Sequence, residues 1–305
     1  MISAGDIASV IGGKLIQEHS SAGISDIKLD TRKPVVGKSA VFFAINGAVH
    51  DGHDYVQSAW DKGIRTFIVE REVALADSTI ILVENSVKAL QVLGGYRRAQ
   101  FQYPVIGITG SNGKTVVKEW LNQLLSADYQ IVRSPRSYNS RVGVPLSLWN
   151  MGAHHSLGIF EAGISQPGEM AAHAKMVNPS IGVLTNVRTA HAENFESRQQ
   201  HIEEKLQLIA RSSHVIIPDD PEILKAARKS CSGEILVWGK GDSADLKISD
   251  VRYHKGNASF GLTISDQAVS LTIPFSDEAS VSNVVNCAAV LHTLGLSLEE
   301  IEHRL

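Results

Sequence analysis

A short segment in the middle of the sequence has the composition of a phosphate-binding loop. It reads TGSNGKT from Thr109 to Thr115, follows the apolar run PVIGI and precedes the amphipathic stretch VVKEWLNQLL. Small residues let backbone N–H groups converge on phosphate oxygens, and a helix start adds partial positive charge. Lys114 could then reach the β- and γ-phosphates of ATP, and the Thr115 hydroxyl could ligate Mg²⁺. The segment predicts an ATP site built from Gly110, Ser111, Asn112, Gly113, Lys114 and Thr115.

The segment departs from the strict phosphate-loop pattern at one place. The pattern G-x-x-x-x-G-K-[ST] requires glycine at position 108, where Ile108 stands, with Gly107 one residue earlier. A Gly-Lys-Thr triplet can arise by chance, but the strand expected before it and the helix expected after it favour a phosphate loop. The departure narrows the class to P-loop proteins whose loop lacks glycine at this position.

The elements that must position this loop indicate an α/β protein in two domains. Residues 1–102 alternate short apolar runs with helical stretches. In residues 103–305, strand candidates alternate with predicted helices and favour a mainly parallel sheet. These candidates are 156–163, 180–187, 214–219 and 234–239. Alternation between 245 and 275 predicts antiparallel hairpins, and 281–295 returns to helix.

The composition limits the classes of function. Lys and Arg number 29 against 32 Asp and Glu, and this net charge of −3 excludes a polybasic nucleic-acid binder or membrane-surface protein. Cys231 and Cys287 cannot build a disulfide framework and lack the spacing of a zinc site. The N-terminus lacks a signal-peptide pattern, and no apolar stretch approaches the roughly 18–20 residues that span a bilayer. We expect a cytoplasmic protein without nucleic-acid partners or membrane insertion.

Four further segments, taken in chain order with the phosphate loop, resemble the Mur ligase family. They are LDTRKPVVGKSAVFFAINGAVHDGHDYV, YNSRVGVPLSLW, EAGISQPGEM and TNVRTAHAENF. Within the family the set is most similar to the MurF type, and SYNSRVGVPLSLW also resembles the ligase half of fused MurF–alanine racemase proteins. The resemblance covers essentially the whole chain. It implies a UDP-MurNAc-peptide-binding domain at 1–102 and a central P-loop ATP-binding domain at 103–305.

The resemblance also implies a reaction. A ligase of this type uses ATP and Mg²⁺ to add D-alanyl-D-alanine to UDP-MurNAc-tripeptide through an acyl phosphate, in peptidoglycan precursor synthesis. Its site must neutralise the transferring phosphoryl group and position the reactants. A MurE-like or folylpolyglutamate-synthase-like ligase, and a nucleotide-binding module without turnover, are the alternatives. Family members also carry a C-terminal domain without a counterpart here, so we expect a fragment, inactive alone, of a monomeric or fused protein.

The resemblance assigns catalytic and metal-binding roles by position. Glu161 matches a glutamate that ligates Mg²⁺, and the end of a parallel strand is where an α/β sheet places ligand chemistry. His191 matches a histidine at a second metal. Lys205 matches a lysine that several members carry as a carbamate, which supplies hard oxygen ligands. Without the resemblance, the first two would be a solvated acid and a structural histidine. Lys205 would be an exposed neighbour of Glu204 on a helix face.

Two further sets of residues would bind the adenine and the substrate. Asn283 and Asn286 match an element near the adenine, with Ser282 where histidine is usual, and Asn139 matches an asparagine at the substrate site. The first domain would bind the UDP-sugar, and Arg32 suits a diphosphate because its guanidinium can bind two oxygens at once. The candidates there are Thr31, Arg32, Asn46, Gly47, Asp51, Gly52 and His53.

Overall fold

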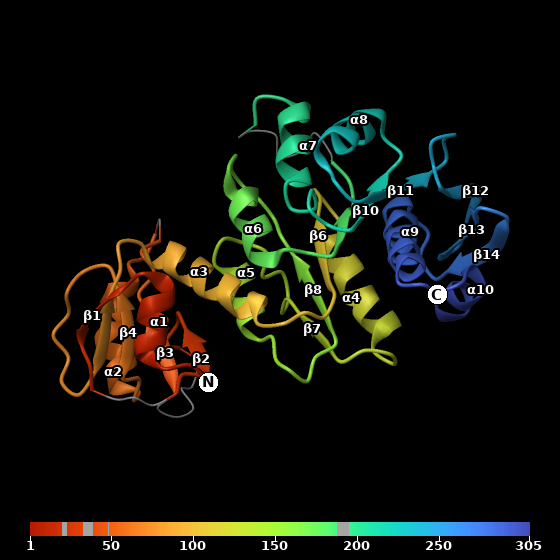
Figure 1. Ribbon diagram of the computed structural model, residues 1–305. Coiled ribbons are helices and arrows are strands. Elements are labelled where there is room, and N and C mark those ends of the chain that lie inside the picture. The colour runs from red at the N-terminus through yellow and green to blue at the C-terminus, as the bar shows by residue number, and fades with distance from the viewer. Residues whose placement is uncertain (20–22, 33–38, 48, 188–194) are drawn as a thin grey trace. The chain divides into compact units, whose positions relative to one another are not determined.

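The structure is a computed structural model that describes residues 1–305 except 20–22, 33–38, 48 and 188–194. Over these described residues the chain divides into two compact units, Met1–Gln100 and Phe101–Leu305 (Figure 1). Within them, no helix has both the length and the apolar character needed to cross a membrane. Each unit combines helices with a mostly parallel sheet, so the expected α/β class is confirmed.

The first unit is built on a mixed sheet whose central strands are apolar. Along the chain it contains α1 (Ala4–Ile11), β1 (Lys14–Gln17), β2 (Asp26–Lys28), β3 (Ala40–Phe43), the 3₁₀ helix η1 (Gly52–Tyr55), α2 (Val56–Asp61), β4 (Thr66–Val69), β5 (Thr79–Leu82) and α3 (Ser86–Ala99). The strand order is β1-β5-β4-β3-β2, with β1 antiparallel to β5 and the other pairs parallel. Phe42 and Phe67 pack with α2 in one core.

The second unit is built on a larger sheet. Along the chain it contains β6 (Val105–Thr109), α4 (Lys114–Leu125), β7 (Ile131–Arg133), α5 (Gly143–Trp149), β8 (Leu157–Glu161), α6 (Glu169–Val177), β9 (Ile181–Leu184), α7 (Arg198–Leu206), β10 (His214–Pro218), α8 (Pro221–Ser230), β11 (Glu234–Gly239), β12 (Leu246–His254), β13 (Asn257–Ile264), β14 (Gln267–Ile273), α9 (Glu278–Thr293) and α10 (Leu298–Arg304). The strand order is β14-β13-β12-β11-β10-β9-β6-β8-β7. Pairing is parallel from β7 to β12, and β12, β13 and β14 form the expected antiparallel hairpins.

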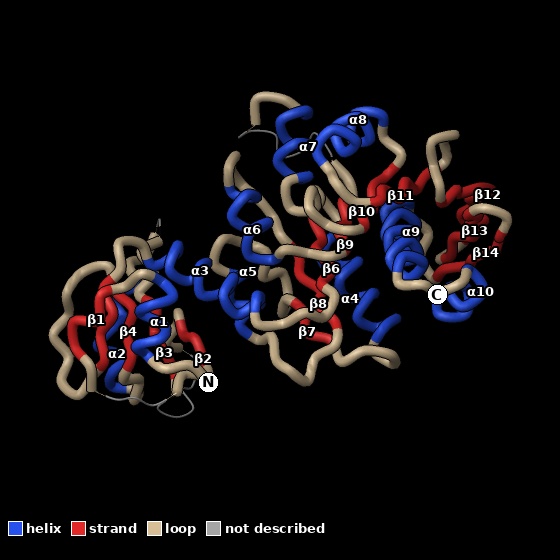
Figure 2. The backbone as a smooth tube through the Cα atoms, viewed as in Figure 1, coloured by secondary structure: helices blue, strands red, loops and turns tan. Residues whose placement is uncertain are grey.

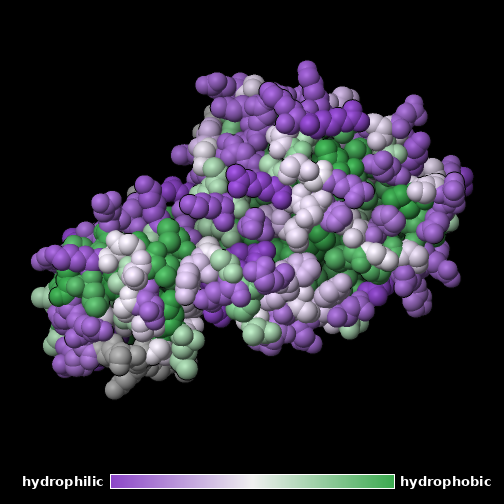
Figure 3. Space-filling view, viewed as in Figure 1, coloured by the Kyte–Doolittle hydropathy of each residue, from purple (hydrophilic) through white to green (hydrophobic). Residues whose placement is uncertain are grey.

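Helices cover both faces of this larger sheet, as Figures 1 and 2 show. Successive side chains of a strand point to opposite faces, so Ile106 and Ile108 enter a core shared with α4, α9 and α10, whereas Val105 enters a core shared with α5 to α8. Polar side chains cover much of the surface visible in Figure 3, with apolar areas between them. The apolar strands are thus the centre of a three-layer structure.

The sheet brings one group of loops together. β6 lies between β8 and β9, and all three strands are parallel, so their carboxyl ends meet at the same edge. The phosphate loop follows β6, Glu161 ends β8, and residues 185–186 follow β9. An α/β sheet places ligand chemistry at this edge.

Candidate functional site

The predicted phosphate loop has a backbone that requires glycine. Gly110 has a φ of +142° and Gly113 a φ of +84°, angles that side chains with a Cβ rarely adopt. A Cβ on Gly110 would also lie 2.0 Å from Thr185 Oγ1. Gly113 is the N-cap of α4, and as a glycine it has no side chain with which to cap this helix. The first-turn N–H groups of α4 are therefore suited to an anion such as a phosphate.

Residues that follow β9 brace the phosphate loop. The N–H of Ser111 donates to Asn186 O (2.9 Å), and the N–H of Asn112 donates to Asn186 Oδ1 (3.1 Å). The Thr185 hydroxyl donates to Asn112 O (2.6 Å). The loop is thus held by the neighbouring strand end as well as by its own helix.

A buried carboxylate meets the start of α4. Glu161 is fully buried, and its Oε2 accepts a hydrogen bond from the Thr115 hydroxyl (2.8 Å). Its Oε1 is buried as well, without a hydrogen-bond partner among the described residues. A buried carboxylate oxygen without a partner is costly, and hydroxyl and carboxylate oxygens are the ligands that Mg²⁺ prefers. The two side chains therefore fit a Mg²⁺ ion, and the interpretation of Glu161 as a solvated acid is wrong.

Two lysines interact electrostatically at this site. The Lys114 ammonium donates to Gly110 O (2.7 Å); burial lowers its pKa, which the Glu161 charge opposes. Lys205, on α7, is only 3% exposed, and burial and then the positive charge of Lys114 lower its pKa to about 7. The interpretation of Lys205 as a solvated helix-face residue is wrong, because this side of α7 is buried. Lys114, Glu161 and Lys205 thus belong to one electrostatic site.

The residues around Lys205 fix α7 in place. The Oε1 atom of Glu204 accepts the N–H groups of Gly168 (2.9 Å) and Met170 (3.0 Å) at the start of α6. The Arg198 guanidinium pairs with the carboxylates of Asp220 (2.5 Å) and Glu222 (2.6 Å) at the start of α8. His191, the other expected metal ligand, lies outside the described residues, so its role stays a prediction.

Helix α9 places Asn283 directly beside the phosphate loop. A Cβ on Gly113 would lie 2.3 Å from Asn283 Oδ1. Asn286 is fully buried, and its Oδ1 accepts the indole N–H of Trp238 (3.1 Å) while its Nδ2 donates to Ser282 O (2.9 Å). Trp238 and Ser282 line a cavity of about 310 Å³. Asn286 therefore orients the wall of this cavity, whereas Asn283 touches the loop itself.

Asn139 lies in the segment between β7 and α5. Its backbone O accepts the N–H of Gly163 (2.8 Å), and its side chain lies against the same glycine. In the same segment, Ser137 Oγ lies 3.4 Å from Thr115 Oγ1. The structure thus connects the expected substrate asparagine with the residues that follow β8 and with the phosphate loop.

The expected UDP-sugar residues Thr31 and Arg32 differ in exposure. Thr31 is buried, whereas the Arg32 side chain is 88% exposed. The Arg32 guanidinium pairs with Asp30, with 2.8 Å between Nη2 and Oδ2. Arg32 is therefore presented to solvent by a neighbouring carboxylate.

The other UDP-sugar candidates lie in the 46–53 loop. Asn46 and Asp51 close the loop as an isolated antiparallel bridge. The N–H of Gly47 donates within the loop (3.0 Å), and a Cβ on Gly52 would lie 2.5 Å from a backbone nitrogen. The two glycines therefore serve a tight turn.

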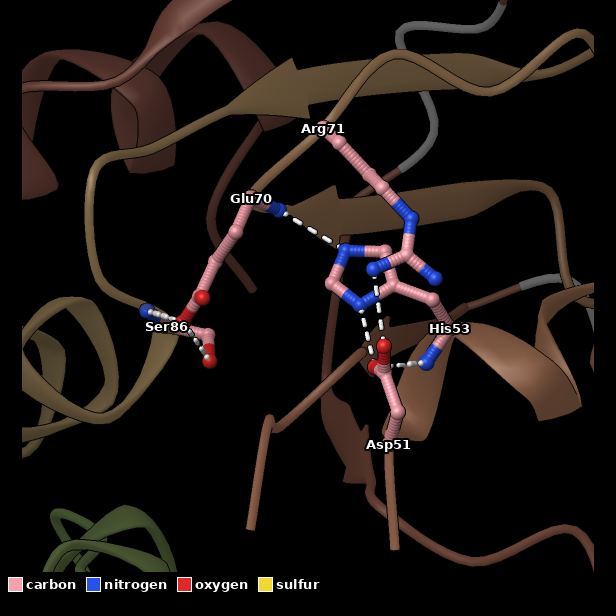
Figure 4. Close-up of polar contacts among 5 residues, drawn as sticks. All are labelled: Asp51, His53, Glu70, Arg71 and Ser86. Atoms are coloured by element: carbon pink, nitrogen blue, oxygen red, sulfur yellow. Dashed lines mark hydrogen bonds and ion pairs between the residues drawn. The ribbon is translucent and has the colours of Figure 1, made fainter.

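Figure 4 shows a polar network behind this loop. The Nδ1 of His53 lies 2.6 Å from Asp51 Oδ1, and its Nε2 accepts the N–H of Glu70 (3.0 Å). Arg71 donates to Asp51 Oδ2 (2.7 Å), and the Glu70 carboxylate accepts the N–H and hydroxyl of Ser86 (2.6 Å each). The N–H of His53 and then the Arg71 guanidinium hold the pKa of Asp51 well below its usual range. Since the His53 side chain is 2% exposed, it shapes the loop from inside.

Sequence reasoning missed three residues of the site. Thr185 and Asn186 follow β9, and the rule that ligand groups gather at the carboxyl ends of parallel strands could have found them. Lys118 is fully buried one helical turn after Lys114. Its signal was a charged residue directly after Val117, on the apolar side of the expected helix.

Two sequence profiles and several named relatives match the chain. Residues 108–291 match the Mur ligase middle domain, and residues 24–129 match the Mur ligase family catalytic domain. The UDP-N-acetylmuramoyl-tripeptide–D-alanyl-D-alanine ligases of Rickettsia prowazekii and Bacillus subtilis are 29% identical over 297 residues and 27% identical over 300. These alignments cover 93% and 97% of this chain but 64% of each relative. The chain therefore spans less than two thirds of their length.

Solved structures agree with these matches. A crystal structure of MurF from Acinetobacter baumannii superposes with a TM-score of 0.90 at 27% identity, covering 100% of this chain and 67% of that chain. The MurF ligase from Thermotoga maritima in complex with ADP gives a TM-score of 0.80 at 29% identity, covering 91% and 65%. The chain belongs to the Mur ligase family, and these relatives, which match most of its length, are of the MurF type.

Proposed function

We propose that the chain is the UDP-sugar-binding and ATP-binding part of a MurF-type ligase. Such a ligase adds D-alanyl-D-alanine to UDP-MurNAc-tripeptide at the expense of ATP. The proposal rests above all on the buried Glu161 carboxylate. Its Oε2 accepts the Thr115 hydroxyl at the start of the phosphate-loop helix, and its Oε1 has no hydrogen-bond partner among the described residues. It is supported by the names of the relatives. We place its action in the cytoplasm.

Residues of the second unit would hold Mg²⁺ and ATP. Thr115, Glu161 and, as a carbamate, Lys205 would bind the metal, with His191 at a second ion. Bound Mg²⁺ neutralises charge on a transferring phosphoryl group. Lys114 would exchange its hydrogen bond to Gly110 O for phosphate oxygens. The adenine would lie near Asn283, in or beside the cavity lined by Trp238 and Ser282.

The reaction needs two displacements. The terminal carboxylate of the tripeptide attacks the γ-phosphorus, an O–P bond forms, and ADP leaves. The amine of D-alanyl-D-alanine then attacks the acyl carbon, loses a proton, and displaces phosphate as the C–O bond breaks. The chain contributes charge neutralisation and alignment. Asn139 would help to place the tripeptide, while Arg32 and the 46–53 loop would hold the UDP group.

Nucleotide binding by Lys114→Ala tests the ATP site. We expect calorimetric titration of the wild-type chain to show ATP binding that weakens when EDTA removes Mg²⁺. Lys114→Ala should abolish this binding, while Lys175→Ala, on the exposed end of α6, should leave it unchanged. Unchanged affinity in Lys114→Ala would overturn the phosphate-loop assignment.

The choice of acceptor separates the MurF and MurE alternatives. A MurF-type chain should bind UDP-MurNAc-tripeptide more tightly than the dipeptide form, and a MurE-like chain should show the reverse. Phosphate release by the native protein, with both substrates present, separates a ligase from a nucleotide-binding module. The buried Glu161 and Lys205 favour the ligase.

A further inference from the structure

Lys118 is a fully buried lysine on α4 whose ammonium group is completely engaged. Its Nζ donates to Ser134 O (2.8 Å) and to Arg136 O. It also lies 3.2 Å from Glu119 Oε1. A lysine has three N–H donors, and a buried charge is tolerated only when it is paired and hydrogen-bonded. These contacts satisfy the charge and tie α4 to the segment that follows β7.

The segment held by Lys118, residues 134–139, reaches the residues that would bind Mg²⁺. The hydroxyl of Ser134 accepts the N–H of Glu161 (3.3 Å), and Ser137 Oγ lies 3.4 Å from Thr115 Oγ1. Ser134 is itself fully buried. Two hydrogen-bond steps therefore connect the Lys118 ammonium with the backbone of Glu161.

A strained residue in this segment gives an independent reason for the hydrogen bonds that Lys118 donates. Arg136 has a φ of +49°, which places a residue with a side chain in the left-handed region. That conformation is unfavourable for a residue with a Cβ, and it persists only where surrounding contacts enforce it. The carbonyl of Arg136 is one of the acceptors of Lys118. The lysine thus holds the turn at its strained residue.

We propose that Lys118 is a positioning residue of the magnesium–nucleotide site. It fixes the 134–139 segment so that Ser134 and Ser137 hold Glu161 and Thr115 in their metal-binding arrangement. Lys118 itself touches neither metal nor nucleotide in this role. The inference rests on the proposed binding of Mg²⁺ by Thr115 and Glu161.

Lys118→Met tests this role because methionine fills much of the same space without the charge and donors. Hydrogen exchange of the metal-free chain should become faster in the peptide that covers 134–139 and at the amide of Glu161. The gain in ADP affinity on adding Mg²⁺ should fall by about tenfold or more, since loss of a residue that orients a metal ligand typically costs about 10–100-fold in metal affinity.

Two further variants separate positioning from general destabilisation. Ser297→Ala removes the N-cap of α10, far along the chain from this segment. It should lower the thermal unfolding temperature by about 2–4 °C without changing the Mg²⁺ effect. Ser134→Ala should reduce the Mg²⁺ effect, and its combination with Lys118→Met should add little, because both act through one contact path.

The outcomes distinguish this inference from the proposed function. If the wild-type chain binds ADP without a gain from Mg²⁺, the proposed metal site fails. If the wild type shows the gain and Lys118→Met keeps it with unchanged exchange at 134–139, the positioning role is overturned. Additive losses in the double variant would also contradict it.

Discussion

The side-chain oxygen of Asn283 occupies the space that a Cβ on Gly113 would need. The ideal Cβ position lies only 2.3 Å from Asn283 Oδ1, and Gly113 has a φ of +84°. Helix α9 therefore holds the phosphate loop by direct contact with its backbone. Glycine is required at 113 for its backbone angle and, separately, for this contact.

Gly113→Ala should be more damaging than Gly256→Ala. Gly256 has a nearly equal φ of +81°, but nothing lies within 4 Å of its Cβ position. Both variants should pay the left-handed cost of about 1–2 kcal/mol, and Gly113→Ala should lose about 1–3 kcal/mol more through overpacking. Urea unfolding measures the difference, and ADP affinity should fall only in Gly113→Ala. Equal losses of unfolding free energy in the two variants would show that the Asn283 side chain moves away at little cost.

Local signals in the sequence predicted the phosphate loop and much of the sheet. The loop is contiguous, so its glycines, Lys114 and Thr115 were visible without any tertiary information. The apolar run before it and the helical spacing after it correspond to β6 and α4. The antiparallel hairpins followed from alternation between 245 and 275, which is β12 to β14. These features depend on neighbours in the chain.

Contacts between distant segments could not be predicted in the same way. Lys205 has charged neighbours in the sequence, and only the packing of α7 shows that it is buried near Lys114. His53 carries a recognisable motif, yet the partner of its Nε2 is the backbone N–H of Glu70, which no residue type reveals. The contact of Lys118 with the 134–139 segment likewise depends on two backbone carbonyls, those of Ser134 and Arg136.

Arg32 and His53 should behave oppositely when each is replaced by alanine. Arg32 is 88% exposed, so its loss should change the free energy of unfolding by less than about 0.5 kcal/mol. The same variant should weaken UDP binding about tenfold or more, since a charged hydrogen bond contributes roughly 1.5–3 kcal/mol. His53→Ala should destabilise the first unit by about 1–3 kcal/mol, because it leaves buried polar groups unpaired. Thermal unfolding and UDP titration measure both. A destabilised Arg32→Ala with normal UDP affinity would contradict this division.

Lys205 should take up carbon dioxide. Because burial and Lys114 lower its pKa to about 7, a large share of the amine is neutral near pH 7 and can attack CO₂. A C–N bond forms and a proton leaves, so the product is a carbamate anion beside Lys114. Carbon-13 NMR with labelled bicarbonate should show a carbamate signal that strengthens as the pH rises above about 7. The signal should be lost in Lys205→Arg; its persistence there would assign it to another amine.

His173 should make the second unit less stable in mild acid. It is fully buried on α6, and neither ring nitrogen has a hydrogen-bond partner among the described residues. Burial lowers its pKa to about 4; the Glu169 charge opposes this shift, and the Arg141 charge adds to it. The protonated ring is therefore disfavoured in the folded chain and free to form in the unfolded one.

The pH range of this effect follows from the two pKa values. As the pH falls below the ordinary value of 6.5, the unfolded chain binds a proton at His173 before the folded chain does, so the free energy of unfolding decreases. The decrease should end near pH 4 and amount to roughly 3 kcal/mol at about 1.4 kcal/mol per pKa unit. Urea unfolding at several pH values between 7 and 4 gives the free energy of unfolding as a function of pH. This free energy should decrease less steeply with falling pH in His173→Phe than in the wild type. His254→Gln, at an exposed site on β12, should keep the wild-type pH dependence. Equal slopes in His173→Phe and the wild type would place the acid sensitivity on another group, because phenylalanine keeps the buried ring and removes only the proton-binding nitrogens.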